Sequence, residues 1–287
     1  MMTKKFSSVL FGLVLMAALS GCGPKGMPIA PESDAADRWQ AFVQRSSQPA
    51  SYDVISGSLR FGPVNDTRRV TYLLWSSDTG APSMLDDNGH EPAGLESADL
   101  AENAPDNART IRLEVNAGVG ANVAKAVFEN GQMLLVLPRD QKAYAGAETP
   151  ETLRRLLGLP LPMRMTKLND FLAGRYLSAL DVPSPERYVT EGDGNIVYCY
   201  RQGGQDFELE LDAQALPVRL SMGKRWSLSI AYDERELPHR LDGSMESDGT
   251  PMRMVLLVKE RRPAGALANA SMELNVPDSF AVYSLDQ

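Results

Sequence analysis

The sequence predicts a mainly β protein, in which about eleven strands form a curled, incomplete antiparallel β-barrel covered by a few short α-helices. From Tyr52 onward, apolar residues recur at every second position in many short segments, which is the pattern of half-buried strands. Tight-turn pairs join consecutive segments, most clearly Asn130-Gly131 and Gly203-Gly204. Strands joined in this way pair antiparallel, and the natural twist of strands curls a large sheet.

The first 21 residues are typical of a signal peptide, with Lys4 and Lys5 before a short apolar run. The run ends in Leu-Ser-Gly-Cys, which resembles the lipobox of bacterial lipoproteins. The resemblance implies cleavage before Cys22 and lipid attachment there, including palmitate-type chains. The residue after it is Gly23 and not Asp, which favours the periplasmic face of the outer membrane of a Gram-negative bacterium. The alternative is an ordinary secretory signal followed by a coincidental cysteine.

Charge and cysteine content narrow the possible functions. Removal of the signal peptide takes away Lys4 and Lys5 and changes the formal net charge from −8 to about −10. An acidic surface repels phosphates, so a nucleic-acid partner is not expected. If Cys22 carries lipid, Cys199 has no partner in the chain, which excludes a disulfide framework and a four-ligand zinc site. Cys199 is then either a small packed residue or a functional thiol.

The chain after the signal peptide begins with a flexible tether over 22–33, rich in Gly and Pro. A single domain over 34–287 follows. It opens with a helix over 34–45, because Trp39, Phe42 and Val43 fall on one helical stripe. Alternating residues then predict strands over 52–61 and 69–76.

Residues 78–108 interrupt this pattern with eight acidic residues and no Lys or Arg. A structureless stretch of this length is unusual inside a compact domain, so it is interpreted as a mobile acidic insertion. The run Asp86 to Glu91 suggests a calcium site, but it lacks the ligand spacing of an EF-hand. A solvated loop is the favoured interpretation.

A strand over 110–115 and a hairpin over 122–138 follow the insertion. The Asn130-Gly131 turn fixes the hairpin register, opposing Phe128 to Met133, Ala126 to Leu135 and Ala124 to Leu137, with Lys125 opposite Val136 on the other face. The face with Phe, Met and Leu is therefore the buried one, and its two alanines leave space above the sheet.

Two short helices are predicted next. Thr149 caps the first, Pro150 occupies its first position and Gly158 ends it. A rigid apolar segment, Leu-Pro-Leu-Pro over 159–162, leads to the second helix over 166–173. The remaining chain predicts strands over 195–202, 205–212, 217–222, 225–233, 238–246, 252–259 and 271–276.

Recognisable catalytic motifs are missing from the sequence. Its two histidines, His90 and His239, have no nucleophile motif near them, and no zinc-protease, phosphate-loop or dinucleotide signature occurs. The chain is therefore predicted not to be an enzyme, and no cofactor or metal is expected. Paired carboxylates, which meet only in space, remain the open enzymatic alternative.

The stretch 52–174 resembles the LolB family of the LolA/LolB superfamily. The matching features are the lipobox, the first helix, strands ending near Trp75, Arg112-Leu113, a short apolar loop, a hairpin and the motif Leu-Leu-Gly-Leu-Pro-Leu-Pro over 156–162. The resemblance implies an incomplete barrel whose apolar cavity takes the acyl chains of lipoproteins and passes them to the outer membrane as a transport chaperone. Such a protein would have as partners the membrane, lipoprotein acyl chains and a periplasmic carrier. The sequence departs from the family in its longer chain and its acidic insertion.

Two sets of site residues follow from the resemblance. An exposed leucine in the family's protruding loop corresponds to Val119, within the proposed membrane-insertion loop Ala117, Gly118, Val119 and Gly120; alternatively Val119 is tucked inward. The expected cavity lining is Leu59, Phe61, Trp75, Leu113, Val115, Phe128, Met133, Leu135, Leu137, Leu157 and Phe171. The competing hypothesis is an interaction lipoprotein on the same fold, with a filled core and no lipid client.

Overall fold

The computed structural model describes residues 32–47, 52–78, 109–118, 120–182, 184–191, 193–202, 204–247, 249–263 and 272–285. The predicted signal peptide, Cys22, the tether up to residue 31, Val119 and nearly all of the acidic insertion lie outside these residues. The last two residues of the predicted tether belong to the first described helix, which begins at Glu32.

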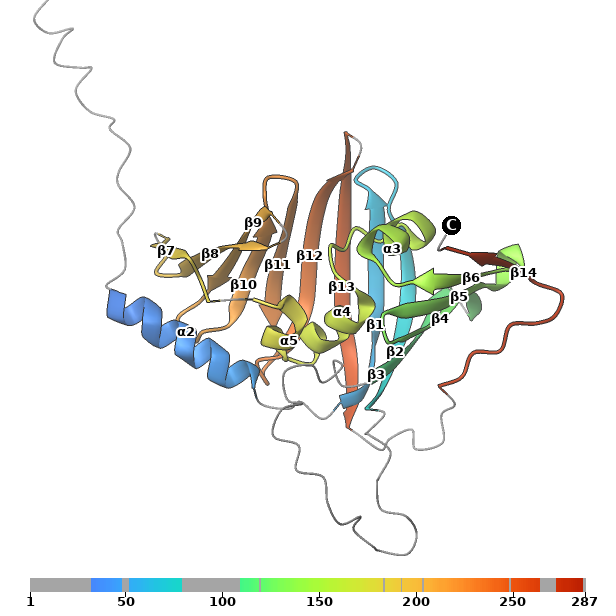
Figure 1. Ribbon diagram of the computed structural model, residues 1–287, viewed down its shortest axis with the longest axis horizontal. Coiled ribbons are helices and arrows are strands. Elements are labelled where there is room, and N and C mark those ends of the chain that lie inside the picture. The colour runs from blue at the N-terminus through green and yellow to red at the C-terminus, as the bar shows by residue number, and fades with distance from the viewer. Residues whose placement is uncertain are drawn as a thin grey trace, which may run out of the picture.

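One large sheet organises the described part of the chain and confirms the predicted fold class, which is mainly β, curled and unclosed (Figure 1). Its spatial order is β14-β6-β5-β4-β3-β2-β1-β13-β12-β11-β10-β9-β8-β7. All neighbours pair antiparallel except β14 and β6, which are parallel. The strands are β1 Tyr52–Pro63, β2 Arg68–Asp78, β3 Arg109–Ala117, β4 Ala121–Glu129, β5 Gln132–Leu137, β6 Lys142–Ala147, β7 Arg187–Thr190, β8 Ile196–Gln202, β9 Gln205–Leu211, β10 Pro217–Met222, β11 Trp226–Tyr232, β12 Pro238–Ser247, β13 Thr250–Pro263 and β14 Ala281–Ser284.

The helices pack against the concave face of this sheet (Figure 1). They are α2 Glu32–Ser46, α3 Pro150–Leu157, α4 Met165–Leu172 and α5 Tyr176–Leu180, and a short 3₁₀ turn, η1 Pro138–Asp140, joins β5 to β6. The predicted start and end of α3 are confirmed. The Thr149 hydroxyl accepts from the Thr152 amide, and Gly158 has a left-handed φ of 69°. We call α3, α4, α5, the residues between them and Asp181, which caps the end of α5, the helical cover.

The predicted register of the Asn130-Gly131 hairpin is confirmed where the structure pairs its strands. Phe128 lies opposite Met133 and Ala126 opposite Leu135 in the β4–β5 hairpin. In the β8–β9 hairpin, Tyr198 lies opposite Leu209. These residues all belong to one hydrophobic cluster that extends under the helical cover and along the concave face. The fold therefore has one continuous core.

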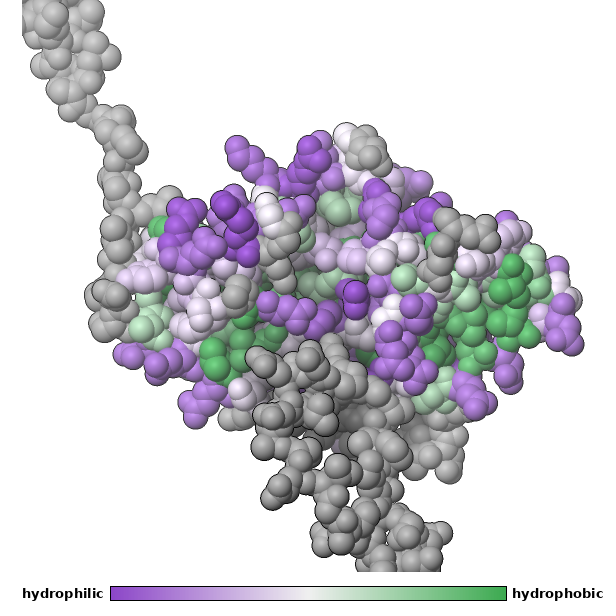
Figure 2. Space-filling view, in the orientation of Figure 1, coloured by the Kyte–Doolittle hydropathy of each residue, from purple (hydrophilic) through white to green (hydrophobic). Residues whose placement is uncertain are grey.

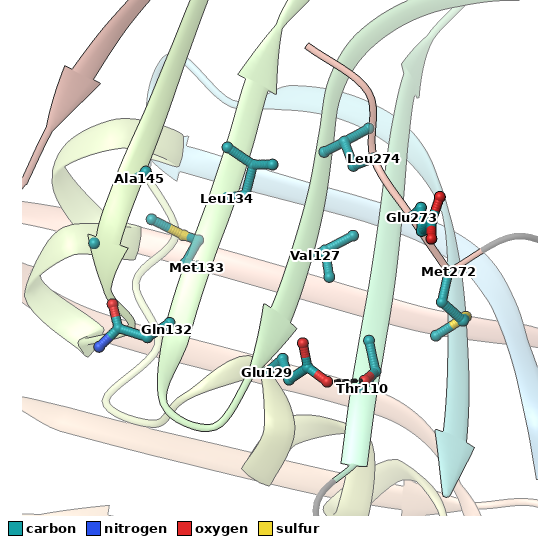
Figure 3. Close-up of a pocket in the computed structure, with 11 residues that line it drawn as sticks. Thr110, Val127, Glu129, Gln132, Met133, Leu134, Ala145, Met272, Glu273 and Leu274 are labelled. Atoms are coloured by element: carbon teal, nitrogen blue, oxygen red, sulfur yellow. Dashed lines mark hydrogen bonds between the residues drawn. The ribbon is translucent and has the colours of Figure 1, made fainter. Parts of the chain in front are cut away.

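The strand predicted over 271–276 is wrong, because residues 272–277 have no regular structure and the last strand is β14. Met272 and Leu274 instead lie over the outer, convex face of the sheet, where Val127 and Leu134 point towards them (Figure 3). The Arg112 guanidinium donates to the Glu273 carbonyl at 3.0 Å. The apolar alternation of this segment thus reflects packing on a sheet face rather than strand pairing, and a groove of about 450 Å³ remains beneath it.

Glycine is required where β1 passes β13. A Cβ on Gly57 would lie 1.8 Å from the Leu257 carbonyl oxygen, which also accepts a hydrogen bond from the Tyr72 hydroxyl at 3.3 Å. The β1–β13 register shifts at this point, between Ser56 and Gly57. A bulge with a close backbone approach is a setting that favours glycine in a strand.

Candidate apolar binding site

Ten of the eleven residues predicted to line a cavity belong to one hydrophobic cluster or pack against it. Six are buried members of the hydrophobic cluster, and Phe61, Val115, Leu137 and Leu157 pack against it. Their packing is dense at the centre, where Phe128, Leu135 and Phe171 are fully buried. The six buried members are Leu59, Leu113, Phe128, Met133, Leu135 and Phe171.

Trp75 is the exception, and its placement corrects the prediction. Leu74 is a buried member of the cluster, and neighbouring residues of a strand point to opposite faces, so Trp75 lies on the convex side. There its ring lies 5.5 Å from the Arg112 guanidinium carbon, a cation–π contact. The two residues are paired across β2 and β3. The alternation of side chains along a strand was by itself sufficient to place Trp75 on the opposite face of the sheet from Leu74.

A pocket opens where the helical cover meets the part of the concave face formed by β9 and β10. Its volume is about 410 Å³, and both β9 and β10 contribute to its floor through Phe207 and Met222. The cover supplies the remaining walls, which are Pro150, Pro162, Met163, Arg164, Lys167, Ala179, Leu180 and Asp181. The sequence analysis did not assign these residues to a site, although the β8–β9 register places Phe207 on the inner face.

Charged residues lie on one side of this pocket. The Lys167 ammonium donates to the Asp181 carboxylate and to the Ser178 carbonyl, both at 2.7 Å. Arg164 is exposed beside them. The pocket is thus an apolar recess whose mouth carries positive charge and one paired carboxylate.

A buried carboxylate fastens the helical cover to the sheet. Asp170 of α4 accepts hydrogen bonds from Arg109 on β3, from Arg175 at 2.7 Å and from the Ser178 hydroxyl at 2.6 Å. Its side chain is only 10% exposed. Since Arg109 belongs to the sheet and the other two donors to the cover, Asp170 joins the two layers. Further along the cover, the Trp226 indole donates to the Pro160 carbonyl at 3.4 Å.

Glu148 is a second carboxylate that sequence reasoning missed. It lies between β6 and α3, is 1% exposed, and accepts a hydrogen bond from the Met165 amide at the start of α4. Burial raises the pKa of this carboxyl, while the amides of Met165 and Thr166 and the charge of Arg164 act in the opposite direction. Glu148 therefore ties the end of β6 to the first turn of α4 at the cost of a buried charge.

The predicted membrane-insertion loop connects β3 to β4. Gly118 and Gly120 are both exposed and have φ values of 57° and 84°, which glycine adopts without strain. A Cβ at either position would meet no atom within 4 Å among the described residues. Ala117 ends β3 and is half-buried, whereas Val119 lies outside the described residues. The role of this loop stays a prediction.

Reactive groups are sparse in the described part of the chain. Among the described residues, no group of three or more His, Cys, Asp or Glu side chains is arranged to hold a metal ion. None of the described helices is both long enough and apolar enough to cross a membrane. Cys199 is a buried free thiol, and burial raises its pKa, which disfavours the reactive thiolate.

No protein-family model matches the sequence, and no curated protein matches it. Solved structures do resemble the fold. A LolA superfamily protein from Nitrosomonas europaea is 8% identical, with a TM-score of 0.48, covering 79% of this chain and 93% of that one. A DUF1329 family protein from Desulfovibrio piger is 10% identical, with a TM-score of 0.45, covering 83% and 96%.

A domain from Vibrio parahaemolyticus assigned to outer membrane lipoprotein sorting is also 10% identical, with a TM-score of 0.44, covering 82% of this chain and 92% of that one. At these identities and scores the likeness is one of fold alone. It assigns this chain no activity and no ligand.

Proposed function

We propose that the protein is a membrane-anchored lipoprotein of the LolB type, which binds acyl chains of other lipoproteins on its concave face and helps insert them into the outer membrane. The observation that carries the proposal is the pocket between the helical cover and the β9–β10 strands, which is continuous with the apolar core. Its volume of about 410 Å³ is within the roughly 300–1,000 Å³ usual for small-molecule pockets.

The composition of the pocket suits an acylated ligand. Phe207, Met222 and Leu180 offer apolar contacts to a hydrocarbon chain, for which each buried methylene contributes about 0.8 kcal/mol. Methionine adapts its shape to irregular ligands, and two methionines, Met163 and Met222, line the pocket. Arg164 and Lys167 at the mouth would face the polar end of such a ligand.

Transfer in this proposal requires no bond making. A client's chains would leave a carrier because the concave face binds them more tightly, and they would leave this face because the bilayer binds them more tightly still. The loop Ala117–Gly120 would enter the lipid interface at the second step, with Val119 at its tip. A Val119→Glu substitution is expected to reduce lipoprotein incorporation, and unchanged incorporation would refute the role of the loop.

Ligand binding can be tested on a chain that starts at Gly23, which retains every described helix and strand. A fluorescent palmitic-acid analogue and a triacylated lipopeptide are the probes, and native mass spectrometry detects lipid that co-purifies. Met222→Trp fills the pocket and should weaken probe binding about tenfold, while Leu73→Trp, half-buried on β2 and outside this pocket, serves as the matched control. Equal binding by both variants would exclude this pocket as the site.

The second candidate function is an interaction lipoprotein that uses the same fold without a lipid client. The dense packing of Phe128, Leu135 and Phe171 favours it, since those side chains already fill the centre of the concave face. Absence of co-purified lipid, together with no binding of either probe, would select this function over the first.

A further inference from the structure

One rim of the sheet concentrates positive charge in an otherwise acidic protein. The rim is formed by the β1–β2, β10–β11 and β12–β13 turns at one end of the long strands, where hydrophilic residues line the upper edge in Figure 2. Its basic residues, all exposed, are Arg60, Arg68, Arg69, Lys224, Arg225 and Arg253. The formal net charge of the whole chain is −8, so this clustering runs against the overall composition.

The arrangement of these cations costs stability. Arg60 and Arg69 lie directly opposite each other across β1 and β2, and like charges in that position repel. No carboxylate of the described residues forms an ion pair with Arg68, Arg69 or Lys224. A surface that keeps unpaired, mutually repelling cations together is suited to an anionic partner.

A broad groove joins the three turns on this rim. Its volume is about 750 Å³, and three cations line it, Lys224, Arg225 and Arg253, together with the carboxylates of Asp242 and Glu246 and the hydroxyl groups of Ser227 and Ser244. The Val64 amide donates to the Pro251 carbonyl and ties the β1–β2 turn to β13 beside the groove. Cations and hydroxyls of this kind donate hydrogen bonds to phosphate oxygens.

Acidic residues near the rim reduce its charge without cancelling it. Asp242 lies 3.7 Å from Arg253, but it is also hydrogen-bonded to Arg240. Asp66 and Glu246 are exposed on the same turns and strands. The described carboxylates closest to the six cations are Asp66, Asp206, Asp242 and Glu246, and Asp206 is paired with Arg201, so the cations remain in excess.

Exposed apolar side chains lie among the charges. Val64, in the β1–β2 turn, is 52% exposed, and Val123, at the start of β4, is 38% exposed. The β2–β3 register places Asn116 beside Thr71, so the Ala117–Gly120 loop opens next to Arg69 at the same end of the sheet. Apolar tips flanked by cations are typical of surfaces that bind the membrane interface.

We propose that this rim is a docking surface for anionic phospholipid headgroups, which holds the domain with its rim against the bilayer. The inference rests on the proposed membrane location, and it specifies which face of the domain meets the lipid. The cations bind headgroup phosphates, and the exposed valines enter the interface between them.

The test uses the chain from Gly23, which has neither signal peptide nor lipid anchor, so its result does not depend on lipidation of Cys22 or on the acyl-chain site. Sedimentation measures binding to vesicles of phosphatidylcholine alone and of phosphatidylcholine with phosphatidylglycerol. The rim variant carries Arg68→Gln, Arg69→Gln and Lys224→Gln. The control variant removes three exposed cations from the opposite end of the strands, by Arg235→Gln, Lys259→Gln and Arg262→Gln. Of these, Arg262 forms an exposed ion pair with Glu260.

We expect the unmodified chain to bind the anionic vesicles, with binding that weakens as salt rises. Each cation near an anionic surface contributes roughly fivefold to partitioning, so the rim variant, which lacks three, should bind about a hundredfold more weakly and the control variant within about twofold of the unmodified chain. Circular dichroism verifies that both variants are folded. Equal binding to neutral and anionic vesicles, no binding by the unmodified chain, or equal losses in the two variants would each overturn the proposal.

Discussion

The attachment of the helical cover depends on Asp170, and Asp170→Asn tests it. The substitution keeps the shape of the side chain and removes the charge that meets Arg109, Arg175 and the Ser178 hydroxyl. Asp170 is 10% exposed, and the two arginines are 21% and 16% exposed, so water screens these contacts only weakly. The Asp170 carboxylate is therefore stabilised mainly by these protein groups and only to a small extent by water.

The expected loss of stability follows from this burial. Removal of one partner from a buried charge pair costs about 3–5 kcal/mol, and the partial exposure of the arginines reduces this cost to about 2–4 kcal/mol. Asp181→Asn is the matched control, because Asp181 also belongs to the helical cover and pairs with Lys167, yet its side chain is 58% exposed. An exposed pair contributes about 0–1 kcal/mol.

Urea unfolding of both variants measures these free energies, and amide hydrogen exchange shows where protection is lost. We expect the Asp170 variant to lose protection in α4 and α5 before the sheet does, because the carboxylate joins those layers. A free-energy change below about 1 kcal/mol for Asp170→Asn, or one no larger than for Asp181→Asn, would refute the reasoning.

Three further predictions concern individual residues. Gly57→Ala should destabilise the fold by about 3 kcal/mol or more in urea unfolding, because its Cβ would overlap the Leu257 carbonyl; a native-like midpoint would contradict the described strand approach. Because the pKa of Glu148 is raised, the folded state favours the protonated carboxyl. This group therefore stabilises the fold below the ordinary pKa of 4.5, and the stabilisation is lost as pH rises from 4.5 through the higher folded-state pKa. The wild-type protein should therefore lose stability relative to Glu148→Gln between pH 4.5 and neutrality, and a constant difference over that range would argue against a raised pKa. Finally, Cys199 in the chain from Gly23 should react with iodoacetamide slowly when native and rapidly in urea, and equal rates would show that the thiol is accessible.

Local signals in the sequence were enough to predict most hairpins of this sheet. The Asn130-Gly131 turn demands positive φ, and both residues have it, so the register of the flanking strands follows without knowledge of the fold. The cap at Thr149 is equally local, since it depends on a hydroxyl and an amide three residues apart. These features needed no tertiary information.

The missed elements depend on tertiary contacts. β6, with the sequence Lys-Ala-Tyr-Ala-Gly-Ala, has little intrinsic strand preference and is held between β5 and β14. β14 pairs with β6 in parallel. Because β14 is far from β6 in the chain, no turn between them could predict this pairing. The pocket between cover and sheet likewise joins Pro162 to Met222, whose proximity only the folded chain shows.

The dense concave face has room for an acyl chain only if that acyl chain displaces part of the helical cover, which goes beyond binding in the pocket whose walls the cover supplies. Met165, Leu168, Phe171 and Leu172 of α4 are all buried, and withdrawing four such side chains costs roughly 6–12 kcal/mol. A chain of about fifteen methylenes contributes about 12 kcal/mol when buried, which is of the same order. The free energy lost by exposing α4 is therefore nearly balanced by the free energy gained by burying the acyl chain. The polar contacts of Asp170 then decide how readily the cover leaves the sheet. Ligand binding by this route should increase hydrogen exchange in α4 and α5. Asp170→Asn should strengthen probe binding while it weakens the fold. Weaker probe binding by that variant would show that the acyl chain needs the cover in place.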